Sequence, residues 1–347
     1  MPSADEALTG RPPDFESRYA AILSACPEAT FFHTRTWAAI LAAAFPGIED
    51  LSQILEIAGR PHAAPLFRRR RWGGAVSSWH SSFPFLYGGP VPATPEALQA
   101  FQLSLARLPG GVVLIGNPFA APRESAATGA AGAPAPPPAG PLPLVWDTTH
   151  LLQLPADVET YWSTVLDTRK RNDIRRLSRK GVIVETTRDE RDVRAIYTLY
   201  RQRMATWRRR PRLVYPLALY SAMVRLGGEA ARCYVARHAG RVIGGTFITR
   251  WNGIVHYNAG YFDDAARPLR PNVLIQERII RDAIEEGGRI YDMLPSAGLA
   301  NVETFKESFG GVRTPFPRWE RLSALARWTG RVRRWARRPQ ERPAHDD

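Results

Sequence analysis

The stretch 231-ARCYVARHAGRVIGGTFITRWNGIVHYNAGY-261 decides the fold of this chain. It contains three runs rich in β-branched and aromatic residues, which predict β-strands. These runs are residues 231–238, 242–251 and 254–261. Ala239-Gly240 separates the first two runs, and Asn252-Gly253, a dipeptide typical of type I′ hairpin turns, separates the last two. The stretch therefore predicts an antiparallel meander of three strands.

Helices and short strands surround this meander in a regular order. Before it, apolar periodicity predicts helices over residues 157–166, 169–180, 190–207 and 217–226, with a strand over 182–185. After it, the pattern predicts a helix over 272–286, a strand over 289–293 and a helix over 301–309. A meander with helices before and after it is typical of the α+β class.

The first part of the chain predicts shorter elements. Helices are expected over residues 15–26, 34–45 and 95–108, and strands over 51–58, 63–70, 77–91, 112–115 and 146–154. Thr34 precedes the second helix and is a suitable N-cap residue. Residues 120–143 are mostly Ala, Pro and Gly, a composition that predicts a flexible insertion without a packed core.

The composition describes a soluble globular protein. The 347 residues are 44% hydrophobic and 10% aromatic, and the chain is long enough for two domains. Cys26 and Cys233 have neither metal-ligand nor redox spacing, which favours a reducing compartment and predicts no metal site. The polar N-terminus lacks the apolar core of a signal peptide, and no run reaches the roughly 18 apolar residues of a spanning helix. We therefore predict a cytoplasmic protein.

Positive charge dominates the sequence. The formal net charge is +14 at pH 7, which predicts an anionic partner. Most of the charge lies in four clusters, at residues 68–71, 169–179, 201–212 and 327–338. Only three of the 47 basic residues are lysines: Lys170, Lys180 and Lys306. Lys is a compact point charge and Arg a planar fork, so a Lys retained in such an arginine-rich chain can indicate a specific role. Lys170 and Lys180 stand among arginines, where we expect them to contribute charge only, whereas Lys306 stands alone.

Three short motifs, taken together with the order of elements, resemble a known family. The motifs are Arg171-x-x-Ile174-Arg175-Arg176-x-x-Arg179-x-Gly181-Val182, Tyr291-Asp292 and Phe305-Lys306-x-x-Phe309-Gly310. The order from residue 182 onward is similar to the GNAT acyltransferase fold. With the motifs, the chain resembles the FemAB-like branch, also described as the BioF2-like acetyltransferase domain, over about residues 30–318. Known members of that branch aminoacylate cell-wall peptidoglycan precursors from aminoacyl-tRNA, and many relatives are acyltransferases of envelope or natural-product pathways.

The resemblance implies two GNAT-like halves, each a mixed, largely antiparallel sheet flanked by helices. The expected boundaries are 14–146 for the N-terminal half, which includes the insertion 120–143, and 147–318 for the C-terminal half, which carries the motifs. Residues 319–347 are expected to form a basic aromatic tail helix followed by a disordered end.

The acyl donor is expected to be a co-substrate, and no tightly bound cofactor is predicted. GNAT enzymes that use coenzyme A usually have a glycine-containing loop before the helix after the meander, where backbone N–H groups hold the pyrophosphate. Here that place reads Arg267-Pro268-Leu269-Arg270-Pro271-Asn272-Val273. The prolines have no N–H to donate, so the departure favours an aminoacyl-tRNA-like donor over acyl-CoA. The side chains of Arg267 and Arg270 remain candidates for binding a donor phosphate.

The resemblance also suggests which residues bind and react. It places the Lys of the Phe-Lys motif near the reacting carbonyl, so Lys306 is our candidate for stabilising the tetrahedral oxyanion, with Phe305 beside the substrate. The alternative is a solvated Lys306 paired with Glu303 or Glu307. A second group of candidates could grip a diphosphate of an anionic acceptor, unless it forms only an exposed basic face: Arg171, Arg175, Arg176 and Arg179.

A general base is harder to assign. Asp292 ends the strand after the meander, at a position that faces the cleft in this fold. Tyr257 and Tyr261 lie an even number of residues apart on the third strand of the meander, so both are expected on one side, and a tyrosine could protonate the leaving group. His256 would face the other side, in a structural role. Structural aromatic roles and substrate-assisted proton transfer are the alternatives.

Aromatic and basic residues continue into the tail, residues 319–338. Apolar residues at near-helical spacing are Trp319, Leu322, Leu325, Trp328, Val332 and Trp335. Such a helix could pack on the body, or bind RNA or the anionic inner face of the membrane.

We therefore predict an acyl- or aminoacyltransferase that acts on an amine of an anionic, cell-wall or lipid-linked acceptor. The alternatives are a coenzyme A-dependent N-acetyltransferase of GNAT type and a non-catalytic RNA- or membrane-surface-binding protein with this fold.

Overall fold

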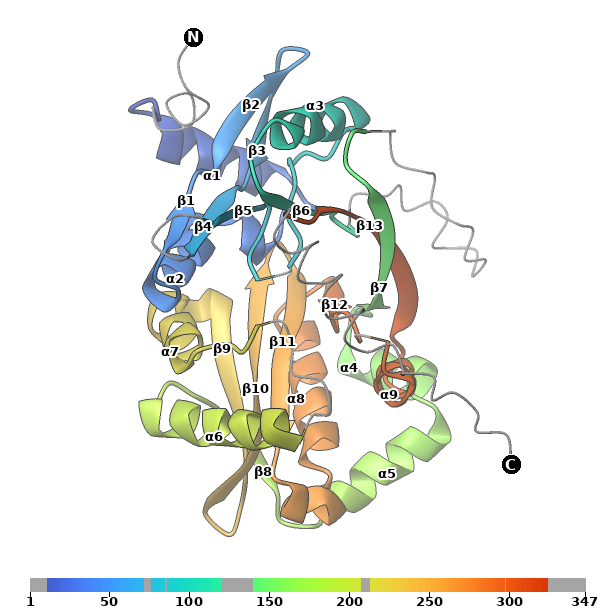
Figure 1. Cartoon of the computed structure of the whole chain (residues 1–347). Coiled ribbons are helices and arrows are strands. Elements are labelled where there is room, and N and C mark those ends of the chain that lie inside the picture. The colour runs from blue at the N-terminus through green and yellow to red at the C-terminus, as the bar shows by residue number, and fades with distance from the viewer. Residues whose placement is uncertain are drawn as a thin grey trace, which may run out of the picture.

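One large sheet runs through the protein (Figure 1). The computed structural model describes residues 11–71, 76–84, 86–119, 140–206, 213–296 and 298–323. Eleven of its thirteen described strands form one sheet. In spatial order they are β1 (Ile48–Asp50), β4 (Phe67–Arg71), β5 (Val76–His80), β6 (Gly111–Ile115), β13 (Val312–Arg321), β7 (Leu144–Gln153), β12 (Ile290–Asp292), β11 (Ile254–Phe262), β10 (Arg241–Trp251), β9 (Ala231–His238) and β8 (Ile183–Thr187). Mostly antiparallel pairing with flanking helices confirms the α+β prediction.

The meander forms as predicted. Strands β9, β10 and β11 pair antiparallel in sequence order. Asn252 and Gly253 both have positive φ, 47° and 72°, as the type I′ turn between β10 and β11 requires. Strand β12 then joins β11 in parallel, which places Asp292 beside His256.

A bulge interrupts the third strand of the meander. Phe247 pairs with Ala259 and Ile248 pairs with Tyr257, so Asn258 is left without a partner across the ladder. One extra residue reverses the alternation of side chains beyond it. Tyr257 therefore packs with the apolar cluster on one face of the sheet and Tyr261 with the cluster on the other. The prediction that both tyrosines face one side is wrong for this reason.

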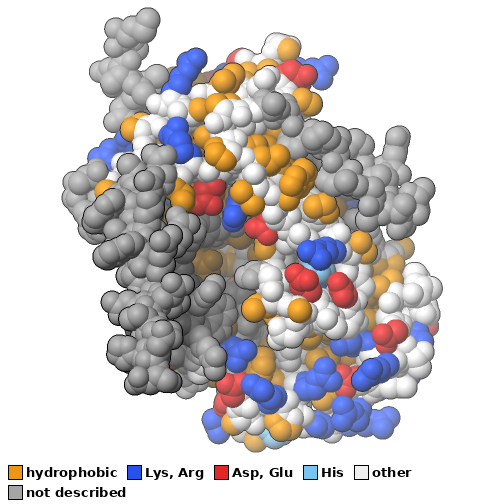
Figure 2. Space-filling model, turned by 45° about the vertical axis from the view of Figure 1, so that its right-hand side comes forward, with side chains coloured by type: hydrophobic (Ala, Val, Ile, Leu, Met, Phe, Trp, Pro, Cys, Tyr) orange, Lys and Arg blue, Asp and Glu red, His pale blue; other side chains and the backbone are white. Residues whose placement is uncertain are grey.

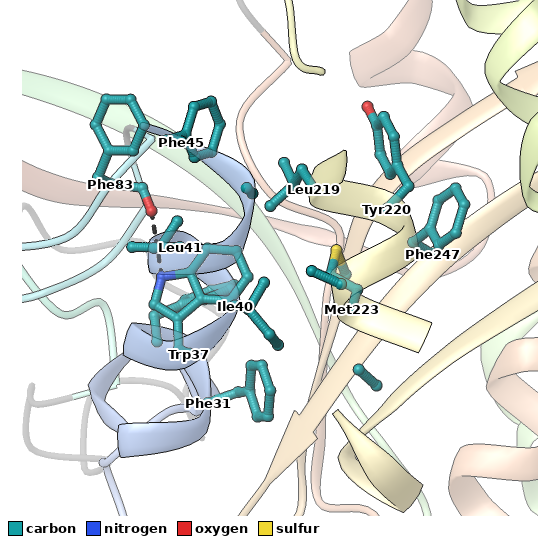
Figure 3. Close-up of a cluster of buried hydrophobic side chains, with 14 of the residues drawn as sticks. Phe31, Trp37, Ile40, Leu41, Phe45, Phe83, Leu219, Tyr220, Met223 and Phe247 are labelled. Atoms are coloured by element: carbon teal, nitrogen blue, oxygen red, sulfur yellow. Dashed lines mark hydrogen bonds between the residues drawn. The ribbon is translucent and has the colours of Figure 1, made fainter. Parts of the chain in front are cut away.

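Helices cover both faces of the meander. On one face lie α6 (Glu190–Thr206), α7 (Leu217–Leu226) and α2 (Arg35–Ala44), and on the other lie α5 (Thr168–Ser178) and α8 (Pro271–Glu285). Figure 3 shows how α2 and α7 pack, with Trp37 and Ile40 from α2 and Met223 from α7 in one buried cluster. The Thr34 hydroxyl accepts a hydrogen bond from Trp37 N at 3.2 Å, which confirms the predicted N-cap.

The N-terminal region is joined to the rest by β13. This strand pairs with β6 on one edge and with β7 on the other, so residues 312–321 lie between two strands of the preceding chain. The expected boundary at 146/147 falls within β7, and the boundary at 318/319 falls within β13. The sheet thus continues across both expected boundaries.

The start of the predicted tail helix is a strand. Trp319 is 1% exposed and packs with Trp79, Phe101 and Leu114 under β6. Because it is buried, Trp319 is not available for a membrane or RNA surface, and the helix prediction is wrong for residues 319–321. The rest of the predicted tail, from residue 324, lies outside the described residues, as do residues 120–139 of the insertion.

Smaller differences concern the edges of elements. The strand expected over 63–70 is divided: β3 (Arg60–Ala64) pairs with β2 (Gln53–Ile57) in a separate two-stranded sheet, and β4 joins the main sheet. The helix expected over 157–166 begins as α4 (Val158–Thr160) and continues as one turn of π-helix, Tyr161–Val165. The remaining helices are α1 (Phe15–Ala25), α3 (Pro95–Ala106) and α9 (Ala300–Glu307). Among the described helices, none has both the length and the apolar character required to cross a membrane.

Candidate active site

Lys306 is a buried lysine on the short helix α9. Only 4% of the residue is exposed, and its ammonium donates a hydrogen bond to the backbone oxygen of Leu294, in the segment after β12. Burial lowers the pKa of Lys306 to about 8, while the negative charges of Asp292 and Glu303 oppose this shift. The alternative of a solvated Lys306 is therefore wrong.

Asp292 is the centre of a buried hydrogen-bond network. Its Oδ1 accepts from Thr149 Oγ1 at 2.5 Å, from Leu294 N at 3.0 Å and from Tyr87 Oη at 3.3 Å. Its Oδ2 lies 2.9 Å from His256 Nδ1, which donates to it. Since Asp292 is fully buried and both oxygens are occupied, it does not face a cleft as the sequence suggested. A general base must reach the proton that it removes, and Asp292 lacks that access here.

The same network positions Lys306 through one backbone segment. Leu294 has φ = 54°, a left-handed conformation that is costly for a branched side chain. Its N–H donates to Asp292 and its carbonyl oxygen accepts from Lys306. Asp292 thus fixes the position of Leu294, and the carbonyl oxygen of Leu294 in turn binds the ammonium of Lys306. His256, for which the sequence predicted a structural role, belongs to this network because β11 pairs with β12.

A groove adjoins the Phe-Lys motif. It lies between α5, α9 and the N-cap residue of α8 and has a volume of about 780 Å³. Residues that line it include Lys170, Asp173, Arg176, Arg270, Asn301 and Phe305. Figure 2 shows Lys and Arg side chains gathered at the lower end of this side of the molecule, where Figure 1 places α5. Phe305 borders the groove while the next residue, Lys306, is buried.

Lys170 is the second buried lysine and was not predicted as a site residue. It is 8% exposed, and its Nζ lies 4.6 Å from the ring centroid of Phe309 and 5.7 Å from that of Phe305. Burial lowers the pKa of Lys170, and the nearby positive charge of Arg270 lowers it further. The motif Phe305-x-x-x-Phe309 is the sequence signal that could have indicated an aromatic wall for a cation.

The structure divides the arginines predicted to bind the acceptor. Arg171 donates to the backbone oxygens of Trp162 and Ser163, at 2.7 and 2.9 Å, and so caps the π-helical turn. Arg175 lies over the Trp162 ring, and Arg179 is exposed at the end of α5. Only Arg176 of these residues lines the groove, where it pairs with Asp173 at 2.7 Å.

Both the sequence and the structure are similar to those of known proteins. Residues 167–307 match the model of the acetyltransferase (GNAT) domain. This part of the chain is similar to a GNAT acetyltransferase domain. No curated protein matches the sequence significantly. The structure is similar to FemX, with 12% identity, a TM-score of 0.59 and coverage of 87% of this chain and 95% of that one.

Two further solved structures share the fold over most of their length. L-PGS from Bacillus licheniformis has 12% identity and a TM-score of 0.51, covering 93% of this chain and 97% of that one. A conserved protein of unknown function from Bacteroides thetaiotaomicron VPI-5482 has 12% identity and a TM-score of 0.52, covering 89% and 97%. The predicted resemblance to the FemAB-like branch of the GNAT superfamily is confirmed at the level of the fold.

In the loop that holds pyrophosphate in many GNAT domains, several backbone N–H groups are here occupied by hydrogen bonds within the loop. Residues Asp264–Leu269 form a 3₁₀-helix, and the N–H groups of Ala266, Arg270 and Val273 donate to carbonyl oxygens within the same turn, at 2.9–3.1 Å. Helix α5 lies against this loop, since Lys180 Nζ donates to Pro268 O at 2.7 Å and Asp173 pairs with Arg270. Few backbone donors are therefore left for a phosphate.

The two arginines of this loop have different surroundings in the GNAT domain. Arg270 borders the groove, whereas Arg267 is exposed, pairs with Asp264 at 2.8 Å and is not among the lining residues. Neither Tyr257 nor Tyr261 lines the groove. Burial raises the pKa of Tyr257 to about 12 and that of Tyr261 as well, which makes both poor proton donors at neutral pH.

Proposed function

We propose that this protein transfers an acyl or aminoacyl group to an amine of an anionic acceptor, from a donor of the aminoacyl-tRNA type. The observation that carries the proposal is the buried ammonium of Lys306 in a GNAT acyltransferase fold. A buried Lys is costly unless its charge is used, and Lys306 stands at the position where the family resemblance expects a catalytic Lys.

The chemistry requires a fixed positive group near the reacting carbonyl. Attack of an amine on an ester or thioester carbonyl gives a tetrahedral oxyanion, which a preorganised donor stabilises. Lys306 donates one of its three N–H groups to Leu294 O, and no other described residue accepts a hydrogen bond from it, which leaves two N–H groups for an oxyanion. Of the residues predicted to transfer a proton, Asp292 is enclosed and Tyr257 keeps its proton. Proton transfer assisted by the substrate fits this arrangement.

The closed loop before α8 favours an RNA donor over coenzyme A. Two prolines lack N–H groups and the neighbouring N–H groups bond within the turn. Coenzyme A would have to bind its pyrophosphate mainly through side chains. An aminoacyl-tRNA needs no such cradle, because its phosphates are spread along an extended strand.

The acceptor is proposed from charge and from the FemAB-like resemblance. The net charge of +14 favours an anionic molecule, and the resemblance favours a cell-wall or lipid-linked acceptor at the inner face of the membrane. Of the four arginines predicted for the acceptor, Arg176 borders the groove but is paired with Asp173, so the geometry singles out none of them for an acceptor.

A donor test examines the proposal. Wild-type protein and Lys306→Met are incubated with acetyl-coenzyme A or with a mixture of aminoacyl-tRNAs, each with lipid-linked and soluble peptidoglycan precursors as acceptors. We expect acyl loss from aminoacyl-tRNA with the wild type, and a rate lower by at least about 10²-fold in the variant.

Two results would contradict parts of this proposal. Turnover of acetyl-coenzyme A at ordinary enzyme rates, with aminoacyl-tRNA left intact, would make the donor assignment wrong. Equal and negligible consumption of both donors by the two proteins would contradict an acyltransferase and support a non-catalytic RNA- or membrane-binding protein.

A further inference from the structure

Lys170 occupies a position that is unfavourable for a cation. It lies in the first turn of α5, where the helix dipole places partial positive charge. It is 8% exposed and packs against the rings of Phe305 and Phe309. Burial in an apolar wall and the positive end of a helix both disfavour the charged form of Lys170. Contact with two ring faces recovers only part of this cost.

The carboxylates near Lys170 are already engaged. Asp167 Oδ1 accepts from the backbone N of Lys170 at 2.6 Å, as the N-cap of α5. Asp173 binds Arg176 through one oxygen and Arg270 through the other. Within the described part of the chain, Lys170 Nζ has no ion pair and donates no hydrogen bond. An incompletely neutralised cation in a groove with three arginines, Arg169, Arg176 and Arg270, is a site for an anion.

We propose that this groove binds a phosphate group of the acyl donor, with Lys170 as its central cation. The inference rests on the proposed function and adds the place at which the donor's phosphate lies. Phosphate suits the site because it carries negative charge and several acceptor oxygens, while the helix dipole of α5 also favours an anion. The groove volume of about 780 Å³ accommodates a nucleotide, and the ring of Phe305 offers a surface for a base.

Lys170 and Arg270 contribute in different ways. Lys170 is held by packing, so it is preorganised and loses little freedom when a ligand binds. Arg270 is partly exposed and pairs with Asp173, so its guanidinium can turn from this carboxylate to a phosphate. Phe305 lines the groove and Lys306 does not, so the groove adjoins helix α9, which carries the residue proposed to act on the acyl group.

Two donors contain such a phosphate, and probes can distinguish them. The 3′ end of an RNA carries phosphodiesters between bases, and coenzyme A carries a pyrophosphate and a 3′-phosphate. We would measure binding of an RNA hairpin with a single-stranded 3′-CCA end, of coenzyme A and of inorganic pyrophosphate by calorimetry at two salt concentrations. The matched variants are Lys170→Met, which keeps the side-chain length without the charge, and Arg179→Gln, which removes an exposed charge from the same helix.

We expect the RNA hairpin to bind, and Lys170→Met to weaken it by at least about tenfold with a smaller dependence on salt. Arg179→Gln should change the affinity less than about twofold, because exposed charges away from the groove contribute little. The unliganded Lys170→Met variant should have a higher Tm than the wild type, since it removes a buried cation without an anionic partner. At equal RNA concentration, the Tm of the variant should rise less than that of the wild type.

Some results would overturn the groove proposal alone. If Lys170→Met is folded and binds all three probes as tightly as the wild type, the groove is not a phosphate site, even if Lys306-dependent acyl transfer is found. If Lys170→Met and Arg179→Gln weaken binding equally, the groove is again not a phosphate site, because the RNA is then attracted by the general positive charge of the helix. Conversely, Lys170-dependent binding without acyl transfer would support the groove and contradict the proposed enzyme. Lys170-dependent binding of coenzyme A but not RNA would support the groove and assign it to the other donor.

Discussion

The three lysines of this arginine-rich chain have three different environments. Lys180 reaches across the surface to Pro268 O, whereas Lys306 and Lys170 are buried. The sequence indicated Lys306 through its motif and through its isolation. For Lys170 the sequence offered only the Phe305-x-x-x-Phe309 motif, and it did not connect that motif to Lys170, because these phenylalanines lie more than 130 residues later in the chain. A motif can be recognised in the sequence, but only the tertiary structure determines which lysine is buried.

Replacing Lys306 by arginine tests whether the shape of the cation matters. Lys306→Arg keeps the charge, but the planar guanidinium is larger and cannot occupy the same buried site beside Leu294 O. We expect the transfer rate to fall by about 10²-fold, the size of loss seen when an oxyanion donor is removed. Lys180→Arg is the matched control and should keep its activity. Full activity in Lys306→Arg, measured as acyl transfer at saturating donor, would exclude a specific role.

The pH dependence of the same pair of proteins adds a second measurement. Because the pKa of Lys306 is lowered to about 8, its ammonium loses its proton as the pH rises through that value. If the charged form stabilises the oxyanion, the wild-type rate should fall above pH 8. The residual rate of Lys306→Arg should not fall there, since a guanidinium stays charged. A wild-type rate that rises through pH 8 would instead indicate that the neutral amine acts as a base.

Among the elements, the sequence predicted correctly those features that depend only on residues close together in the chain. The Asn252-Gly253 turn and the Thr34 cap each depend on a few neighbouring residues, and both form as predicted. The bulge at Asn258 is different, because its register is set by the partner strand and not by a residue type that demands it. A single inserted residue then moved Tyr261 to the opposite face from Tyr257. Periodicity therefore located the strand correctly and assigned one of its faces wrongly.

Helix α5 separates structural arginines from those at the groove. Arg171 donates to two carbonyl oxygens of the π-helical turn, so Arg171→Ala should reduce the free energy of unfolding by about 1–3 kcal/mol. The exposed Arg179→Ala should change it by less than about 0.5 kcal/mol. Urea unfolding of the two variants provides the comparison. Unchanged stability of Arg171→Ala, together with weaker binding of a diphosphate acceptor, would restore the role first predicted for Arg171.

For the whole molecule, the decisive feature is the return of the C-terminal strand. Strand β13 lies between β6 and β7, so the last described strand completes the sheet of the first region. No local pattern could predict this arrangement, because strand pairing over 200 residues depends on the complete topology. Of the aromatic residues that suggested a tail helix, Trp319 belongs to this strand. Two halves joined in one sheet should unfold together.

Two tryptophans on neighbouring strands test this unity. Trp319 on β13 is 1% exposed and fills the core under β6, whereas Trp146 on the adjacent β7 is 43% exposed. Trp319→Ala should therefore reduce the free energy of unfolding by about 3–5 kcal/mol, and Trp146→Ala by far less. If the sheet is one cooperative unit, Trp319→Ala should also speed hydrogen exchange in β9 and β10, at the distant end of the strand order. Faster exchange confined to strands β4, β5 and β6, with β9 and β10 unchanged, would mean that the meander and its GNAT domain fold independently of the first region.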